Sequence, residues 1–347
     1  MEETVGEPAV AGVPLLRRFT VFEAAGIDEV RPRVAQLLSS FRPTAGGGSG
    51  MLCDLSAVGF GPFSLIYART YGDEFAVELT EQVSYYDVNF ALFGTNQVDT
   101  DEERLVLTQQ SGCILSPGMG AKMQVSDGYR QLHLRIERFA LERCLEQMLG
   151  RHVVGPVRFR TGMDLTVPAL ASWARGIRLF VRDLDEVSGL SAFGPELSPW
   201  ASFVMTGLLL AQPHDHSAQL AQRLAAPARP PSVKRVVELI ERDPGGDLSL
   251  ARLSAVSGVG PRSLQRSFRR HTGVSPREYI QSVRLARAHE DLVAGAGATV
   301  ADIALRWGFN HVPRFAHAYK ERYGVPPSTT LRASQAEMMT LKDRFRS

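Results

Sequence analysis

Basic and amide side chains fill one short stretch, from Pro261 to His271, that contains no acidic residue. Guanidinium and amide groups can form paired hydrogen bonds with guanine and adenine edges, and further guanidinium groups suit phosphate oxygens. Leu264 and Phe268 are four residues apart, so a helix that buries both leaves the polar side chains on its outer face. Those side chains are Arg262, Ser263, Gln265, Arg266, Arg269 and Arg270. A solvated basic face has the same composition, so the surrounding elements must decide between the two interpretations.

The surrounding pattern occurs twice. Each copy has an apolar helix, a glycine turn and a second helix with aromatic or leucine residues four apart, and the copies are offset by 50 residues before the turn and 51 after it. This is the pattern of two helix-turn-helix units, and it favours nucleic-acid binding over a solvated basic face. The first copy contains Leu253, Gly258, Leu264, Phe268, Gly273 and Pro276, and the second contains Ile303, Gly308, Phe315, Tyr319, Gly324 and Pro327.

A helix between the two copies is predicted from Pro276 to the breakers Gly295 and Gly297. At about 18 residues it spans roughly 27 Å. Successive turns of the major groove recur about every 34 Å, so this helix can place two recognition helices on one face of DNA.

The charge distribution separates the two halves of the chain. Residues 232–347 carry 19 Lys and Arg against 11 Asp and Glu, a net charge of +8. Residues 1–231 carry 20 against 26, a net charge of −6. The basic half therefore contains the expected partner surface for double-stranded DNA.

The first half is predicted to be strand-rich and then helical. Apolar and polar residues alternate over residues 63–71 and 132–137, as in an antiparallel barrel or sandwich. Helices are expected at 140–149, 168–188 and 197–212. The predicted organisation is an N-terminal arm and flexible loop at 1–50, a sensor and dimerisation domain at 51–225, a proline-rich linker at 226–231, a DNA-binding domain at 232–333 and a tail at 334–347.

The runs GVGPRSLQRSFRRHTGVSPREYIQSVRLARA and ADIALRWGFNHVPRFAHAYKERYGVPPSTTLR resemble the DNA-binding domain of AraC/XylS transcription regulators. Residues 111–150 are similar to the cupin-like sensor half of the XylS branch. The resemblance implies an α+β cupin-like β-barrel with following helices, and an all-α domain with two helix-turn-helix units joined by a long helix. It also implies a sequence-specific activator that responds to a small organic effector, forms a homodimer and contacts RNA polymerase.

In the second unit the resemblance places base-reading positions at Val312, Pro313, Arg314 and His317, with His311 and Lys320 beside them on the DNA-binding surface. The side chains of Val312 and Pro313 cannot hydrogen-bond to bases. Pro313 also requires the helix to begin near Asn310 or His311. We therefore expect the second unit to anchor the protein more than it specifies the sequence.

Metal and cofactor chemistry are not expected. A catalytic barrel would bring several histidines and a carboxylate together, and the strand region offers only His133. His133 is expected to be structural, and a pocket-facing position stays open. The His214-Asp215-His216 run is expected to be a solvated loop.

Enzymatic alternatives are not favoured either. A DNA alkyl-repair protein needs an activated cysteine in a Pro-Cys-His setting, and Cys53, Cys113 and Cys144 have no such neighbours.

Glu2, Glu3 and Glu7 are unlike the basic start of a signal peptide, and no apolar run could span a membrane, so a cytoplasmic protein is expected.

A regulator that needs no effector, whose first half only dimerises or docks a partner, remains open. The strand-region aromatic residues could line a pocket or fill a core, and a core is expected. The stripe Trp200, Val204 and Leu208 is expected to pack on its own domain. The aromatic residues concerned are Phe63, Tyr67, Tyr85, Phe90 and Phe93.

Overall fold

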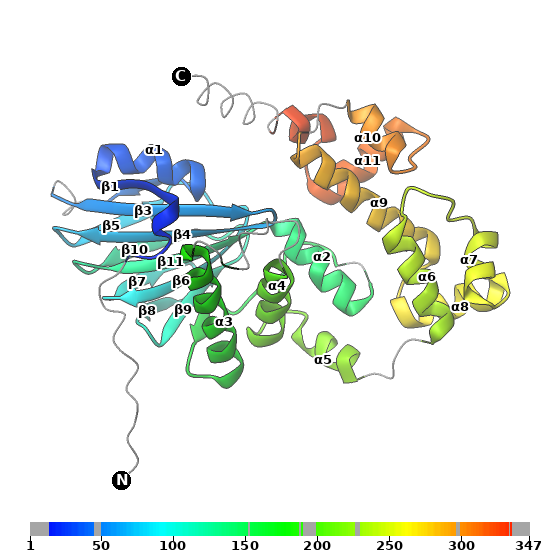
Figure 1. The fold of residues 1–347 in the computed structure, drawn as a ribbon, viewed down its shortest axis with the longest axis horizontal. Coiled ribbons are helices and arrows are strands. Elements are labelled where there is room, and N and C mark those ends of the chain that lie inside the picture. Colours follow the sequence, from blue (N-terminus) through cyan, green and yellow to red (C-terminus); the bar gives the residue numbers. More distant parts are fainter. Residues whose placement is uncertain are drawn as a thin grey trace, which may run out of the picture. The chain divides into compact units, whose positions relative to one another are not determined.

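The structure is a computed structural model, and it divides into two compact units (Figure 1). The first contains Met1–Leu145 and Val154–Ala221, and the second contains Glu146–Val153 and Gln222–Ser347. The predicted arm at 1–13, the loop at 45–49, most of the linker and nearly all of the tail lie outside the described residues. The structure describes residues 14–44, 50–151, 153–186, 189, 199–225, 230–295, 299–332 and 334.

Two antiparallel sheets form the β part of the first unit. They do not close into a barrel, so the predicted barrel is corrected to two facing sheets. The larger sheet has seven strands in the order β1 (Thr20–Gly26), β3 (Leu52–Phe60), β4 (Phe63–Tyr71), β11 (Arg130–Ile136), β6 (Tyr86–Phe93), β9 (Ser111–Leu115) and β12 (Gly162–Asp164). The smaller has five in the order β2 (Phe41–Pro43), β5 (Phe75–Leu79), β10 (Lys122–Val125), β7 (Asn96–Asp99) and β8 (Arg104–Leu107).

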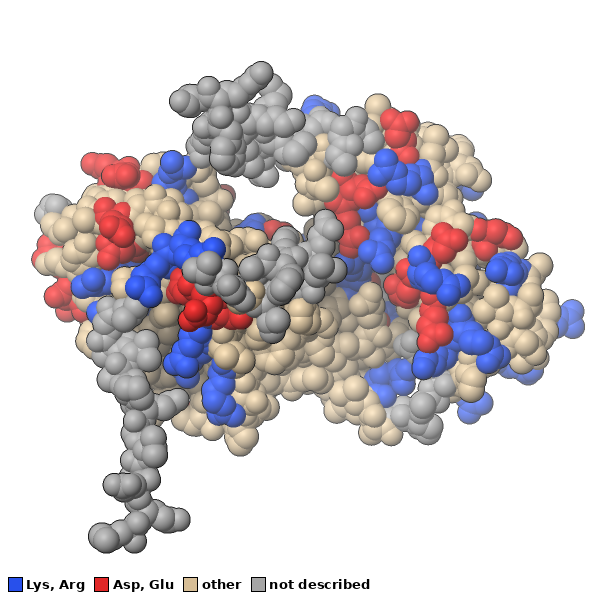
Figure 2. Space-filling view, viewed as in Figure 1, with Lys and Arg blue, Asp and Glu red and all other residues tan. Residues whose placement is uncertain are grey.

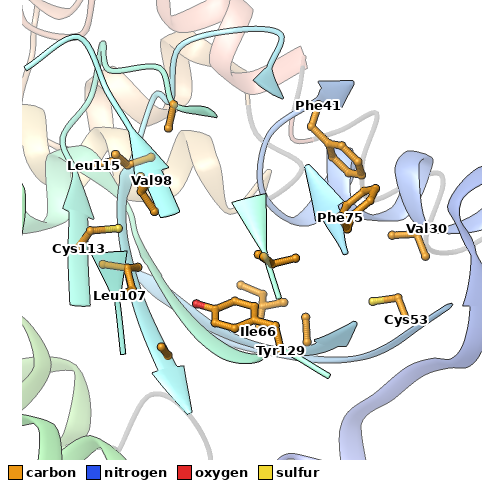
Figure 3. Packing of buried hydrophobic residues seen from close by; sticks show 14 of the residues in the cluster. Val30, Phe41, Cys53, Ile66, Phe75, Val98, Leu107, Cys113, Leu115 and Tyr129 are labelled. Carbon is orange, nitrogen blue, oxygen red and sulfur yellow. The ribbon is translucent and has the colours of Figure 1, made fainter. Parts of the chain in front are cut away.

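Both faces of the larger sheet are covered. Ile66 and Cys53 on one face belong to a core cluster with Phe41 and Phe75 of the smaller sheet (Figure 3). The opposite face carries Phe63, whose ring centroid lies 5.9 Å from that of Phe180 in α3 (Pro168–Asp185). Because neighbouring residues of a strand point to opposite faces, the central strands contribute to two separate cores.

The first unit has more elements near its start than the sequence indicated. Within the segment expected to be an arm, residues 17–43 form η1 (Arg17–Phe19), β1, α1 (Ile27–Leu37) and β2. β1 is an edge strand that buries only Ala25, so its sequence lacks the alternation of a half-buried strand.

The remaining helices of this unit follow the predicted positions, apart from α5 (Ser217–Ala225), which was not predicted. They include α2 (Arg138–Leu149) and α4 (Trp200–Ala211). The Trp200 ring stacks on Phe180 at 4.6 Å, and Val204 and Leu208 are fully buried, which confirms that this stripe packs within its own domain.

The second unit is entirely helical in its described part. Its helices are α6 (Pro231–Arg242), α7 (Leu250–Ser257), α8 (Pro261–Thr272), α9 (Pro276–Val293), α10 (Val300–Arg306) and α11 (Val312–Tyr323). α6, which the sequence analysis did not single out, buries Val236 and Ile240 against Leu264 and Phe268. The predicted connecting helix is confirmed as α9.

Candidate nucleic-acid interface

The first helix-turn-helix unit consists of α7 and α8. Gly258 ends α7 with a φ of 74°, a left-handed conformation that glycine adopts without a Cβ penalty. Pro261 is the first residue of α8, where its missing N–H costs no helical hydrogen bond. Leu264 and Phe268 are fully buried, which fixes the rotation of α8 about its own axis.

The polar side chains of α8 lie on the opposite face, as predicted. All six are exposed, and none of the intervening positions is acidic. Lys and Arg side chains are prominent over this end of the second unit in Figure 2. The exposed residues are Arg262, Ser263, Gln265, Arg266, Arg269 and Arg270.

The second helix-turn-helix unit consists of α10 and α11. α10 begins with a capping box, in which Thr299 and Asp302 satisfy each other's backbone N–H groups. His311 caps α11, because its Nδ1 accepts a hydrogen bond of 3.2 Å from the Arg314 backbone N–H. Pro313 therefore lies in the first turn, as the sequence required.

The predicted contact residues of α11 are also on the surface. Phe315 and Tyr319 are fully buried on the other side of this helix. His311, Arg314, His317 and Lys320 are exposed. The capping bond occupies Nδ1 of His311, so only Nε2 of that ring remains for a ligand.

Arg284, at the middle of α9, links the two helix-turn-helix units and was missed from the sequence. Its guanidinium donates to the carbonyl oxygens of Pro244 at 2.7 Å and Gly246 at 3.2 Å, in the segment that precedes α7. It also donates to the Gly308 carbonyl at 3.0 Å, in the turn between α10 and α11. One side chain thus holds the segment between α6 and α7, and the turn between α10 and α11, to the connecting helix.

α9 itself starts from a second capping box. The Ser275 backbone N–H donates to Glu278 at 2.7 Å, and the Glu278 N–H donates to Ser275 Oγ at 3.3 Å. Hydrogen bonds from the Ser275 backbone and side chain lower the pKa of the Glu278 carboxyl, because they favour its charged form.

The other candidate sites lie in the first unit. His133 is buried on the face of β11 toward the smaller sheet, and its Nδ1 lies 2.9 Å from Asp87 Oδ1. His214 is buried as well, which corrects the expectation of a solvated loop; its ring hydrogen-bonds with the Leu209 carbonyl. Within the described residues no three metal-ligating side chains come together.

The cysteines lack the environment of a reactive thiolate. Burial raises the pKa of the Cys53 thiol to about 12, and it also raises the pKa values of Cys113 and Cys144. A thiol with a raised pKa is mostly protonated at neutral pH and is a poor nucleophile. In the part of the chain that the structure describes, no helix is long and apolar enough to cross a membrane.

A cavity of about 110 Å³ lies between the two sheets and α1. Tyr85 and His133 line it, so His133 faces a pocket and also makes a structural contact with Asp87. Phe63 and Phe90 instead face α3, and Phe93 is 47% exposed, so most of these aromatic residues do not form a pocket.

Comparison with known proteins matches both units. A model of the AraC-binding-like domain matches residues 30–210, and a helix-turn-helix domain model matches residues 253–333. The probable thc operon regulatory protein of Rhodococcus erythropolis is 31% identical over 286 residues, which cover 80% of this chain and 84% of that protein.

Two further similarities each cover less than a third of this chain. The XylDLEGF operon transcriptional activator of Pseudomonas putida is 37% identical over 110 residues, 31% of this chain and 34% of that protein. The structure of a probable AraC family regulator from Rhodopseudomonas palustris CGA009 is 35% identical and covers 30% of this chain and 96% of that one, with a TM-score of 0.29. On the domain models and the long Rhodococcus match, the chain belongs to the AraC/XylS family of DNA-binding transcriptional regulators.

Proposed function

We propose that this chain binds a specific DNA sequence through both helix-turn-helix units and activates transcription in response to a small organic effector. The observation that carries the proposal is the exposed, acid-free outer face of α8. Arg262, Gln265 and Arg266 take the base-reading role near the start of the helix, whereas Arg269 and Arg270 suit phosphates further along it.

The second helix-turn-helix unit takes the supporting role on the DNA. His311, Arg314, His317 and Lys320 contribute mainly phosphate contacts and orientation, since Val312 and Pro313 at the start of α11 offer no side-chain hydrogen bonds. The active species is a non-catalytic cytoplasmic homodimer that contacts RNA polymerase, with residues 232–333 as the DNA-binding domain.

The effector is proposed to bind in the cavity of the first unit. Regulation requires that it bind two arrangements of the protein with different affinity. Coupling is reciprocal, so operator DNA must change effector affinity by the factor by which effector changes operator affinity. If operator DNA leaves effector affinity unchanged, the first half only dimerises or docks a partner.

Salt-dependent DNA binding tests the DNA contacts. We expect the full chain to bind its site with an affinity that falls steeply with salt, because phosphate contacts release counterions. Replacing Arg269 and Arg270 with Ala should lower the slope of log affinity against log salt by about one for each phosphate that the variant no longer binds. Arg175→Ala, which removes an exposed charge from α3, is the control and should leave the slope unchanged. Equal slopes for all variants would refute the assigned role of α8.

A further inference from the structure

The cavity in the first unit has an apolar wall and a polar floor. Its wall comes from α1 and the smaller sheet, including Val30, Val34, Phe41 and Phe75. Its volume is about 110 Å³. For comparison, an engineered apolar cavity of about 150 Å³ holds benzene. The inference below rests on the proposed effector response and concerns the chemical class of the effector.

The floor consists of Thr70, Asp87, Gln131 and His133 on the larger sheet. Asn89 belongs to the same row of polar side chains but does not line the cavity. Asn89 Nδ2 lies 2.9 Å from Gln131 Oε1 and 3.5 Å from His133 Nε2, and His133 Nδ1 is paired with Asp87. Gln131 is paired with Ala68 of β4, two residues before Thr70, so Thr70 lies diagonally beside Gln131 on the same face. All five side chains come from the central strands β4, β11 and β6.

Two oxygens in this row have no hydrogen-bond partner. Thr70 Oγ1 and Asn89 Oδ1 are both buried and unpaired, and the two residues are only 7% and 1% exposed. A buried unpaired polar group is costly, because it has lost its bonds to water without replacing them. Of the two residues, Thr70 lines the cavity. Its Oγ1 can accept a hydrogen bond, so a ligand that donates one would remove the cost at this atom.

The charges around the cavity disfavour an anion. Asp87 and His133 are the charged-type side chains among the described lining residues, and each is the other's partner. Arg135 follows on the same face of β11, but it donates to Glu137 at 2.7 Å and lies over the Tyr85 ring. A carboxylate ligand would therefore lose its hydration beside Asp87 without a cation in return.

We propose that the cavity binds an uncharged molecule, about as large as a single six-membered ring, that carries one hydroxyl or amide N–H. The ring contacts the apolar wall, and the N–H or O–H donates to Thr70 Oγ1. Uncharged phenols, alcohols and small amides fit this description, and carboxylates of the same size do not.

Two matched pairs of probes test the class. The full chain, labelled with ¹³C at the methionine methyl groups, is titrated with phenol against toluene and with benzamide against benzoate. Met51 and Met123 line the cavity, and Met163 lies outside it as an internal control. We expect shifts at Met51 and Met123 only, phenol binding about fivefold tighter than toluene, and benzamide about tenfold tighter than benzoate.

The variant Thr70→Val locates the hydrogen bond, since it replaces a hydroxyl with a methyl of similar size. It should lower phenol affinity about fivefold and leave toluene affinity unchanged. Tighter binding of toluene or benzoate than of their partners would overturn the proposed class while leaving an effector site in place. If no probe shifts Met51 or Met123, the cavity is not an effector site. DNA binding is measured separately on the same protein, so a failure of the effector site would not affect the test of the DNA-binding proposal.

Discussion

The two helix-turn-helix units share a fold but begin their second helices differently. α8 starts at Pro261, and its first five residues include the exposed Arg262 and Gln265. α11 starts at Val312 and Pro313, and the ring nitrogen of His311 is used to cap the helix. The first turn of a recognition helix enters the groove, so polar groups that form a cap there are no longer available to bases. The comparison leads us to expect that the first copy reads the sequence and that the second mainly anchors the protein on DNA.

The largest expected effect comes from Arg284, which is common to both units. Arg284→Ala removes three hydrogen bonds from one charged group, so we expect the free energy of unfolding of the second unit to fall by about 3 kcal/mol. Hydrogen exchange should show faster opening in both α7 and α10. Arg284→Lys is the control with the charge retained, and it should recover only part of the loss, because one ammonium group cannot reproduce the planar guanidinium fork. Faster exchange in α10 alone would mean that the two units are not held by this residue.

A smaller effect, on DNA affinity, distinguishes a side chain that reads bases from one that binds phosphates. Arg266→Ala should weaken binding to the cognate site by about 1 to 3 kcal/mol and weaken binding to random DNA much less. Arg314→Ala should weaken both by similar amounts, because a phosphate contact carries no sequence information. Competition assays with cognate and random duplexes measure the four values. If Arg314→Ala weakens binding to the cognate site much more than binding to random DNA, the second helix-turn-helix unit also reads bases.

The smallest effect is the response of the two capping boxes to acid. Hydrogen bonds to Ser275 lower the pKa of Glu278, and those to Thr299 lower the pKa of Asp302. Each carboxylate therefore adds stability that is complete above its unfolded pKa, about 4.3 for Glu and 3.9 for Asp, and that is lost as the pH falls through the folded value. We expect the melting temperature to fall below about pH 4, and to fall less steeply in Glu278→Gln and Asp302→Asn. An unchanged slope in both variants would show that the capping boxes do not contribute.

Much of the second unit could be predicted because its sequence pattern is local. Turn glycines, first-turn prolines and apolar residues four apart determine where its helices begin, end and face. Arg284 could not be predicted, because its partners are backbone carbonyl groups in segments distant along the chain. Every residue has such a group, so no pattern of residue types in the sequence indicates the contact.

The first unit was harder to predict for a different reason. Alternation located β4 and β11, but it left open whether His133, on the polar side of β11, faces a pocket. The sheet is covered on both faces, so the polar residues Gln131 and His133 lie inside and line the cavity. Which face of a two-sided strand meets which neighbour depends on contacts between distant strands.

The double burial of β11 has a mechanical consequence. His133 faces the cavity, and Leu132 and Leu134, its neighbours on either side, belong to the face that carries Phe63 and meets α3. A small rotation of this strand about its own axis that brings His133 toward a ligand must move both leucines at the same time, in the opposite direction. The interior of a protein is close-packed, so the side chains beneath them have to readjust. A ligand in the cavity would therefore displace side chains that pack against α3. The displacement would pass through β11 alone, and no channel between the cavity and the helical layer is needed.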